Sequence, residues 1–177
     1  GIEFPGGPKI EKYAEQGDKN RFSLPKPILN RGGCNLSFAG LKTSILRIRS
    51  EIKTEQDKHD LAASFQKTIE EILNEKTKKA FEIYLNENKN LKRTFVVAGG
   101  VAANKGIKNK LTKLSEDNKF ECLFPDISLC SDNAAMIALV GLEKFKKKLF
   151  DELNFKVNPR WQLDETAQFL KGAGVKI

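Results

Sequence analysis

Histidine is nearly absent from this chain of 177 residues, since His59 is the only one. A zinc site of several histidines, or a Ser-His-Asp triad, therefore cannot be built from this chain alone. The three cysteines, Cys34, Cys122 and Cys130, are odd in number and are not paired at metal-site spacing. This usage is typical of reduced thiols in a cytosolic protein.

Long apolar runs are also missing. No stretch reaches the roughly 18 apolar residues that a membrane-spanning helix needs, so we expect no membrane span. Residues 1–12 (GIEFPGGPKIEK) do not resemble a signal peptide, and their abrupt start leads us to expect a piece of a longer chain. The dinucleotide pattern G-x-G-x-x-G and the phosphate-loop pattern with its Gly-Lys-Ser/Thr ending are both absent.

The composition is that of a soluble globular protein, with 40% hydrophobic and 31% charged residues. A chain of this length can bury a core as one domain, or as one domain with a small subdomain. The formal net charge of +8 favours an acidic partner, with nucleic acid as the first candidate. The alternative is a lysine-rich surface that only faces solvent.

Residues 94–111 (TFVVAGGVAANKGIKNKL) are the stretch around which the rest is organised. They predict a buried strand over residues 95–98, a Gly99-Gly100 turn, and a helix that opens near Ala102 or Ala103 and ends near Ser115. Ligands of open α/β sheets collect at such strand ends, and the following helix N-terminus favours anions. The alternative is a tightly packed turn that binds nothing.

Three helices are predicted before this stretch. The first covers residues 9–16 and stops at Gly17. The second is amphipathic, ends near residue 52, and has Ser37 as its N-cap. Its basic side chains lie off the apolar stripe, where they are either solvated or in contact with RNA. The third runs from an Asp60 cap to about Glu87 and has an apolar stripe that includes Phe65 and Ile69.

Three further elements are predicted after the central stretch. Residues 119–124 (KFECLF) are a second strand candidate, and residues 126–132 form a loop. A helix follows over residues 133–149, and the small residues in its first half predict close packing against another element. The C-terminal tail, rich in small and polar residues, is expected to be weakly ordered.

Five sequence blocks then stand in order along the chain: FPGGPKIEK at residues 4–12, LSFAGLKT at 36–43, VVAGGVAANKGIK at 96–108, CSDNAAMIA at 130–138 and NPRW at 158–161. Together they resemble the C-terminal half of the tRNA threonylcarbamoyladenosine transferase family, once described as O-sialoglycoprotein endopeptidase. No nucleophile-base pair and no complete metal-protease motif support the older protease label.

The resemblance implies an α/β fold, the second lobe of an actin-like ATPase fold with a helical insertion. It implies a linker and first helix over residues 1–30, a helical insertion over 31–90, an α/β ligand-binding core over 91–163, and a tail over 164–177. The family transfers a threonylcarbamoyl group from threonylcarbamoyl-adenylate to the adenosine next to the anticodon of tRNA. Its bacterial members are cytoplasmic and work with accessory proteins, one an inactive paralogue that forms a heterodimer with the transferase.

The resemblance also implies site residues. Gly7 and Asn104 are expected to contact the adenosine or ribose part of ATP or of the acyl-adenylate. Glu11 falls where many members place an acidic ribose contact. Gly99 and Gly100 match the turn on the adenosine side of the ligand. No catalytic residue is assigned in this chain.

Asp132 matches the aspartate that binds the family's single divalent metal, usually iron, although an N-cap is the alternative for this residue. The family's two metal-binding histidines belong to an HxxxH motif in its N-terminal half, and His59 has no such context. We therefore expect one ligand of a metal site, one wall of a cleft, and no catalysis by this chain alone. The alternative is a non-catalytic module that binds nucleotide, tRNA or a partner protein.

Overall fold

A computed structural model of the chain describes residues 1–88 and 91–159. It divides into two compact units, Gly1–Ser131 and a second that begins at Asp132, and each is described by itself. The first unit holds four α-helices, two strands and three short 3-10 helices among its described residues. This mixture of helices and a small parallel sheet confirms the predicted α/β class.

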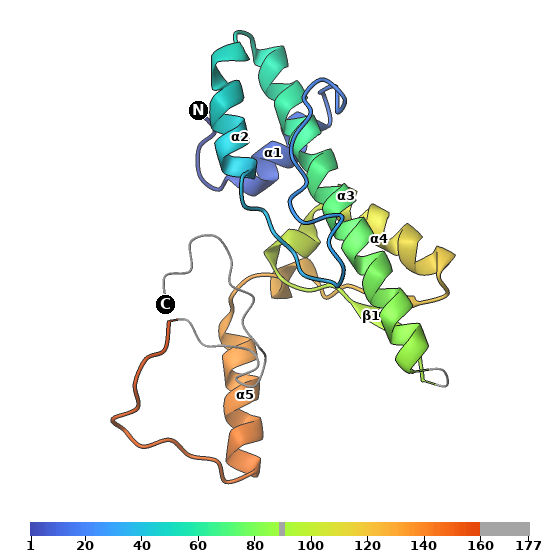
Figure 1. Cartoon of the computed structure of the whole chain (residues 1–177). Helices are drawn as coiled ribbons and strands as arrows, with labels where there is room; N and C mark the ends of the chain where they lie inside the picture. Colours follow the sequence, from blue (N-terminus) through green and yellow to red (C-terminus); the bar gives the residue numbers. More distant parts are fainter. Residues whose placement is uncertain (89–90, 160–177) are drawn as a thin grey trace. The chain divides into compact units, whose positions relative to one another are not determined.

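The helix α3 (Glu55–Glu87) is the element against which the rest of the first unit packs (Figure 1). Its 33 residues correspond to a length of roughly 50 Å. The predicted start at Asp60 is wrong, because Thr54 caps the helix and forms a capping box with Asp57. Asp60 lies inside the helix, where its carboxylate accepts from the Asp18 N–H at 2.8 Å and pairs with Arg21.

The helix α1 (Gly6–Ala14) and the residues after it lie against the N-terminal part of α3. The helix starts three residues earlier than predicted and takes Pro8 into its first turn. Gly17 follows the helix as expected. A Cβ at Gly17 would lie 2.0 Å from the backbone oxygen of His59, so only glycine allows this close approach to α3.

The helix α2 (Leu41–Ile48) leads into the 3-10 helix η1 (Arg49–Glu51). The prediction of Ser37 as its N-cap is wrong, because the cap is Gly40, whose φ of 87° suits glycine. The Ser37 hydroxyl instead accepts from the Ala39 N–H at 3.3 Å, in a turn before the helix. Leu41 packs with Leu24 and Ile72 in one of two buried apolar clusters.

The strands β1 (Thr94–Val96) and β2 (Glu121–Leu123) pair in parallel, with Phe95 opposite Cys122. The helix α4 (Lys105–Asp117) connects them and packs on α3 through the second apolar cluster. In that cluster the rings of Phe81 and Phe120 stack with centroids 3.9 Å apart.

The prediction of a buried strand over residues 95–98 is wrong in length and in burial. The strand ends at Val96, whose side chain is 61% exposed. A strand buried on both faces needs neighbours and cover on both sides. The sheet has two strands within the described residues, and its helix α4 packs toward α3.

In the second unit the helix α5 covers Ala134–Lys146 and ends three residues before the predicted position. Lys148, just beyond it, has a φ of 55°, which is incompatible with a continued helix. The prediction of close packing by its small residues is not met, since no residue of α5 is buried.

Three other predictions concern the cysteines, a membrane span and the C-terminal tail. All three cysteines are free thiols, as predicted. Among the described residues, no helix is both long enough and apolar enough to cross a lipid bilayer. The predicted tail at residues 164–177, together with Arg160 and Trp161 of the NPRW block, lies outside the described residues.

Candidate functional site

A pocket of about 580 Å³ lies in the first unit, between α1, α3, the start of α4, and the 3-10 helix η2 (Gly100–Ala103). Most of its lining is apolar: Pro8, Ile10, Phe38, Phe65, Ile69, Leu73, Val101, Ala103 and Ile107. A few polar groups complete the lining, which is the usual construction of a site for a small organic ligand. We call it the Glu11 pocket, after the only charged residue that lines it.

Four of the predicted site residues line this one pocket: Gly7, Glu11, Gly100 and Asn104. They come from two segments that are 89 positions apart in the sequence, Gly7–Glu11 and Gly100–Asn104. Gly99 does not line the pocket, although it is next to Gly100. Asp132 belongs to the second unit.

The turn before α4 explains how Asn104 reaches the pocket. Gly99 has a φ of 91° and precedes η2, which separates the strand from the helix. The predicted helix start at Ala102 or Ala103 is therefore wrong, and α4 begins at Lys105. Asn104 is its N-cap, because its side-chain oxygen accepts from the Ile107 N–H at 2.9 Å.

The side chain of Asn104 is also fixed from the α3 side. Its Nδ2 donates to Gln66 Oε1 at 3.2 Å, and Gln66 Nε2 donates to Glu70 Oε1 at 3.1 Å. A Cβ at Gly106 would lie 2.5 Å from Gln66 Nε2, so a glycine at this position leaves room for the glutamine. Asn104 is thus held in one orientation, with one Nδ2 hydrogen left for another partner.

The carboxylate of Glu11 lies at the N-terminus of α4. Its Oε1 accepts from the Lys105 N–H at 2.6 Å, although the two residues are 94 positions apart. Because helix N-termini favour negative charge, the anion predicted at this turn is supplied here by the protein itself. A ligand phosphate would be repelled from this corner, whereas hydroxyl groups could donate to the carboxylate.

The sequence interpretation missed the α3 side of the pocket. Phe65 and Ile69 belong to the predicted apolar stripe of the long helix, but the stripe does not distinguish a core contact from a pocket wall. Gln66 is one of many polar residues on that helix, and no sequence signal singles it out. Phe38 lies in the LSFAGLKT block, which carries the resemblance but contains no predicted site residue.

Asp132 is exposed and forms no hydrogen bond or ion pair with the described residues. The alternative interpretation of Asp132 as the N-cap of α5 is wrong, because Asn133 is the cap and accepts from the Met136 N–H at 3.0 Å. No cluster of three or more His, Cys, Asp or Glu side chains suited to a metal occurs among residues 1–88 and 91–159. His59 packs edge-on against Tyr13, with ring centroids 4.8 Å apart.

Comparison with known proteins identifies the family of the chain. The sequence model of the family described as tRNA N6-adenosine threonylcarbamoyltransferase matches residues 1–139, which include every predicted site residue. The chain belongs to this family. The predicted resemblance is confirmed.

Curated relatives support the membership. A protein of Pelagibacter ubique named tRNA N6-adenosine threonylcarbamoyltransferase is 64% identical over 177 residues, which is 100% of this chain and 50% of the relative. A protein of the same name from a Ruegeria species is 46% identical over 99% of this chain and 50% of its own length. One from Rickettsia massiliae is 46% identical over 93% of this chain and 48% of its own length. The chain spans about half the length of the curated relatives it matches.

Proposed function

We propose that this chain is part of an acyltransferase that moves a threonylcarbamoyl group from threonylcarbamoyl-adenylate to the adenosine next to the anticodon of tRNA. The observation that carries the proposal is the Glu11 pocket. Four residues that the family resemblance selected for nucleotide contact line the same cavity. The name of the relatives, which specifies transfer to a tRNA adenosine, supports the same reaction.

The nucleoside half of the adenylate suits this pocket. The rings of Phe38 and Phe65, with the aliphatic side chains around them, offer an apolar surface for a base. Glu11 can accept hydrogen bonds from the two ribose hydroxyls, and the remaining Nδ2 hydrogen of Asn104 can reach a ribose or base acceptor. Gly7 and Gly100 lack side chains, so the ligand can approach their backbone. The phosphate would point away from Glu11.

The proposed reaction is an acyl transfer. The exocyclic nitrogen of the tRNA adenosine forms a bond to the carbamoyl carbon and gives up a proton. The bond between that carbon and the phosphate oxygen breaks, and AMP leaves with the electron pair. In this scheme the chain binds and orients the adenylate, and no described residue is assigned the role of proton acceptor.

The divalent metal of the family, proposed to be iron, has one candidate ligand in this chain. Asp132 fits as a single oxygen ligand, because its carboxylate is exposed and is not used as a helix cap. The other ligands would come from the part of the relatives that this chain does not cover. When bound, such a metal would supply Lewis-acid polarisation of the acyl-adenylate. Loss of iron binding in Asp132→Asn, measured in a protein that contains both halves, would test the ligand.

The remaining parts of the proposal concern the whole protein. We assign the chain to the C-terminal lobe of an actin-like fold, acting in the cytoplasm with accessory proteins that include an inactive paralogue. By this assignment the chain alone does not modify tRNA. Transfer by the isolated 177-residue chain, at a rate near that of a full-length relative, would refute this last point.

Calorimetry with AMP tests the pocket. We expect the 177-residue chain to bind AMP, and we expect Asn104→Ala and Glu11→Gln to weaken binding roughly tenfold or more. The first removes a hydrogen-bonding amide, and the second replaces a charged acceptor by a weaker neutral one. Glu15→Gln is the matched control, because it makes the same charge change just after α1 and does not line the pocket. If all three variants bind AMP as the unchanged chain does, the nucleotide site lies elsewhere. Complete absence of AMP binding would favour an inert fragment or a module that binds only tRNA or a partner protein.

A further inference from the structure

Residues 19–50 form a stretch of the chain that contains no aspartate or glutamate. We call it the acid-free segment. It carries seven cationic side chains: Lys19, Arg21, Lys26, Arg31, Lys42, Arg47 and Arg49. Two of them are neutralised by α3, since Arg21 pairs with Asp57 and Asp60, and Lys26 pairs with Glu71. The other five form no ion pair with the described residues. The seven cations and the absence of acids give the segment a formal charge of +7.

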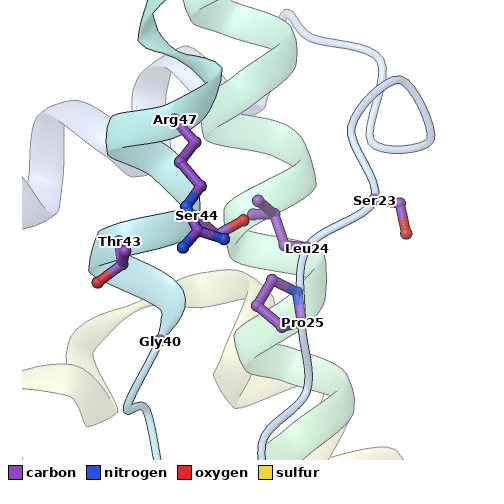
Figure 2. A pocket seen from close by; sticks show the side chains of 7 residues that line it. All are labelled: Ser23, Leu24, Pro25, Gly40, Thr43, Ser44 and Arg47. Carbon is purple, nitrogen blue, oxygen red and sulfur yellow. The ribbon is translucent and has the colours of Figure 1, made fainter.

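A second pocket, of about 610 Å³, is built entirely from this segment (Figure 2). Its wall on one side is α2 with the residue that caps it, and its wall on the other side is the extended stretch before α2. Its lining residues are Ser23, Leu24, Pro25, Gly40, Thr43, Ser44 and Arg47. We call it the Arg47 pocket. None of its lining residues is acidic.

Helical spacing explains why these polar groups face the same pocket. Gly40, Ser44 and Arg47 are separated by four and three positions, which places them on one face of α2. Figure 2 shows the Arg47 side chain extending along α2 toward Ser44, with Leu24 and Pro25 on the facing stretch. The guanidinium of Arg47 forms no hydrogen bond or ion pair with the described residues, so its donors are available to a ligand.

The donors in this pocket suit phosphate oxygens. A guanidinium offers a planar fork of N–H groups that matches two oxygens of a phosphate, and the Thr43 and Ser44 hydroxyls can donate to others. A concave surface without carboxylates concentrates positive potential, which raises the local concentration of an anion. Leu24 and Pro25 add an apolar wall that a sugar or base can cover. Its volume of about 610 Å³ is in the range of sites for small organic ligands.

We propose that the Arg47 pocket binds a backbone phosphate of the tRNA substrate, with Arg47 as the main contact. This inference rests on the proposed function, which makes tRNA a substrate. It adds a site that is separate from the Glu11 pocket and has the opposite charge. RNA is favoured over an acidic protein because the pocket has both hydrogen-bond donors for a phosphate and, beside them, an apolar wall that a sugar or base can cover. Such a contact positions RNA without reading its sequence.

The test uses fluorescence anisotropy of the 177-residue chain with a labelled RNA of the anticodon stem-loop. We expect Arg47→Gln to weaken binding roughly five- to tenfold and to lower the slope of log affinity against log salt by about 1. Arg49→Gln is the matched control, since it removes the same charge two positions away and does not line the pocket. Its affinity should stay within about twofold of the unchanged chain. Arg47→Lys should lie between the two, because it keeps the charge and loses the fork.

Three results would overturn the inference. Equal losses in the Arg47 and Arg49 variants would mean that binding depends on diffuse charge and not on the pocket. RNA binding that is absent, or indifferent to Arg47, would remove the site. If polyglutamate competed with the RNA at an equal concentration of charge, and that competition depended on Arg47 in the same way, the pocket would be assigned to acidic proteins instead of RNA. AMP binding in the Glu11 pocket is measured separately, so failure of the proposed function can be distinguished from failure of this inference.

Discussion

At the scale of single residues, the two glycines that open α1 have different roles. A Cβ at either Gly6 or Gly7 would meet no atom within 4 Å, so the fold does not require glycine at these positions. Gly7 lines the Glu11 pocket and Gly6 does not. Packing among the described residues therefore does not require glycine at position 7. We propose that Gly7 is a glycine because a side chain there would obstruct the ligand.

Replacing Gly7 by alanine should separate binding from stability. We expect Gly7→Ala to keep or slightly raise the melting temperature, because alanine is preferred to glycine in a helix by about 1 kcal/mol at interior positions. The same variant should weaken AMP binding roughly tenfold, since the methyl group occupies space beside the ligand. Gly6→Ala is the control and should bind AMP normally. Calorimetry and thermal unfolding of both variants would decide, and equal AMP affinities would remove Gly7 from the site.

At the scale of elements, the N-terminus of α3 is fixed by a single carboxylate. Asp57 accepts from the N–H groups of Lys53 and Thr54, both at 2.7 Å, and pairs with Arg21. These two backbone hydrogen bonds, followed by that of the Thr54 hydroxyl and the contact with Arg21, lower the pKa of Asp57 to about 2. One buried side chain therefore joins the start of α3 to the segment that follows α1.

The lowered pKa predicts a pH-dependent contribution to stability. The folded pKa is below the ordinary value of 3.8, so ionised Asp57 stabilises the fold above about pH 4. That contribution is lost as the pH falls toward 2. We expect Asp57→Asn to lower the urea midpoint of unfolding at pH 7. The difference in midpoint between the variant and the unchanged chain should become smaller as the pH falls. Asp117→Asn, at the exposed end of α4, is the control. A difference in urea midpoint that stays constant from pH 7 to pH 2.5 would contradict the lowered pKa of Asp57.

The sequence predicts those features of the elements that depend on neighbouring residues, and it does not predict those that depend on contacts distant in the sequence. The apolar stripe of α3 predicts the helix and its end near Glu87, which the structure has. Aspartate is a good cap, which predicts a start at Asp60, but the Asp60 carboxylate binds Arg21 and the Asp18 N–H, which are about 40 positions away. The prediction of a buried strand over residues 95–98 is wrong for a similar reason. Whether a strand is buried depends on other elements that pack on it, and the local sequence pattern does not specify these.

The site was predictable in part. The family blocks selected Gly7, Glu11, Gly100 and Asn104, and the structure brings these four to one pocket. The hydrogen bond from the Lys105 N–H to Glu11 depends on packing across 94 positions and has no sequence signal. The same holds for Gln66, which orients Asn104.

At the scale of the whole molecule, the first unit presents two pockets of opposite character. The Glu11 pocket is mostly apolar with one carboxylate, and the Arg47 pocket combines polar and apolar groups with one cation. We propose that the first holds the nucleoside of the acyl donor and that the second holds the backbone of the RNA acceptor. Because the chain spans about half the length of its relatives, we propose that the remaining groups for the chemistry belong to the other half.

The most direct measurement is the perturbation of backbone amide signals when AMP is added to the ¹⁵N-labelled chain. Glycine amides are well separated in such spectra, and the chain has 13 glycines spread along its length. We predict that the signals of Gly7 and Gly100 shift on saturation with AMP, together with Asn104. The signals of Gly32 and Gly141, which do not line the pocket, should not move. Shifts confined to residues 23–47, or no shifts at saturating AMP, would contradict the assignment of the Glu11 pocket as the nucleoside site.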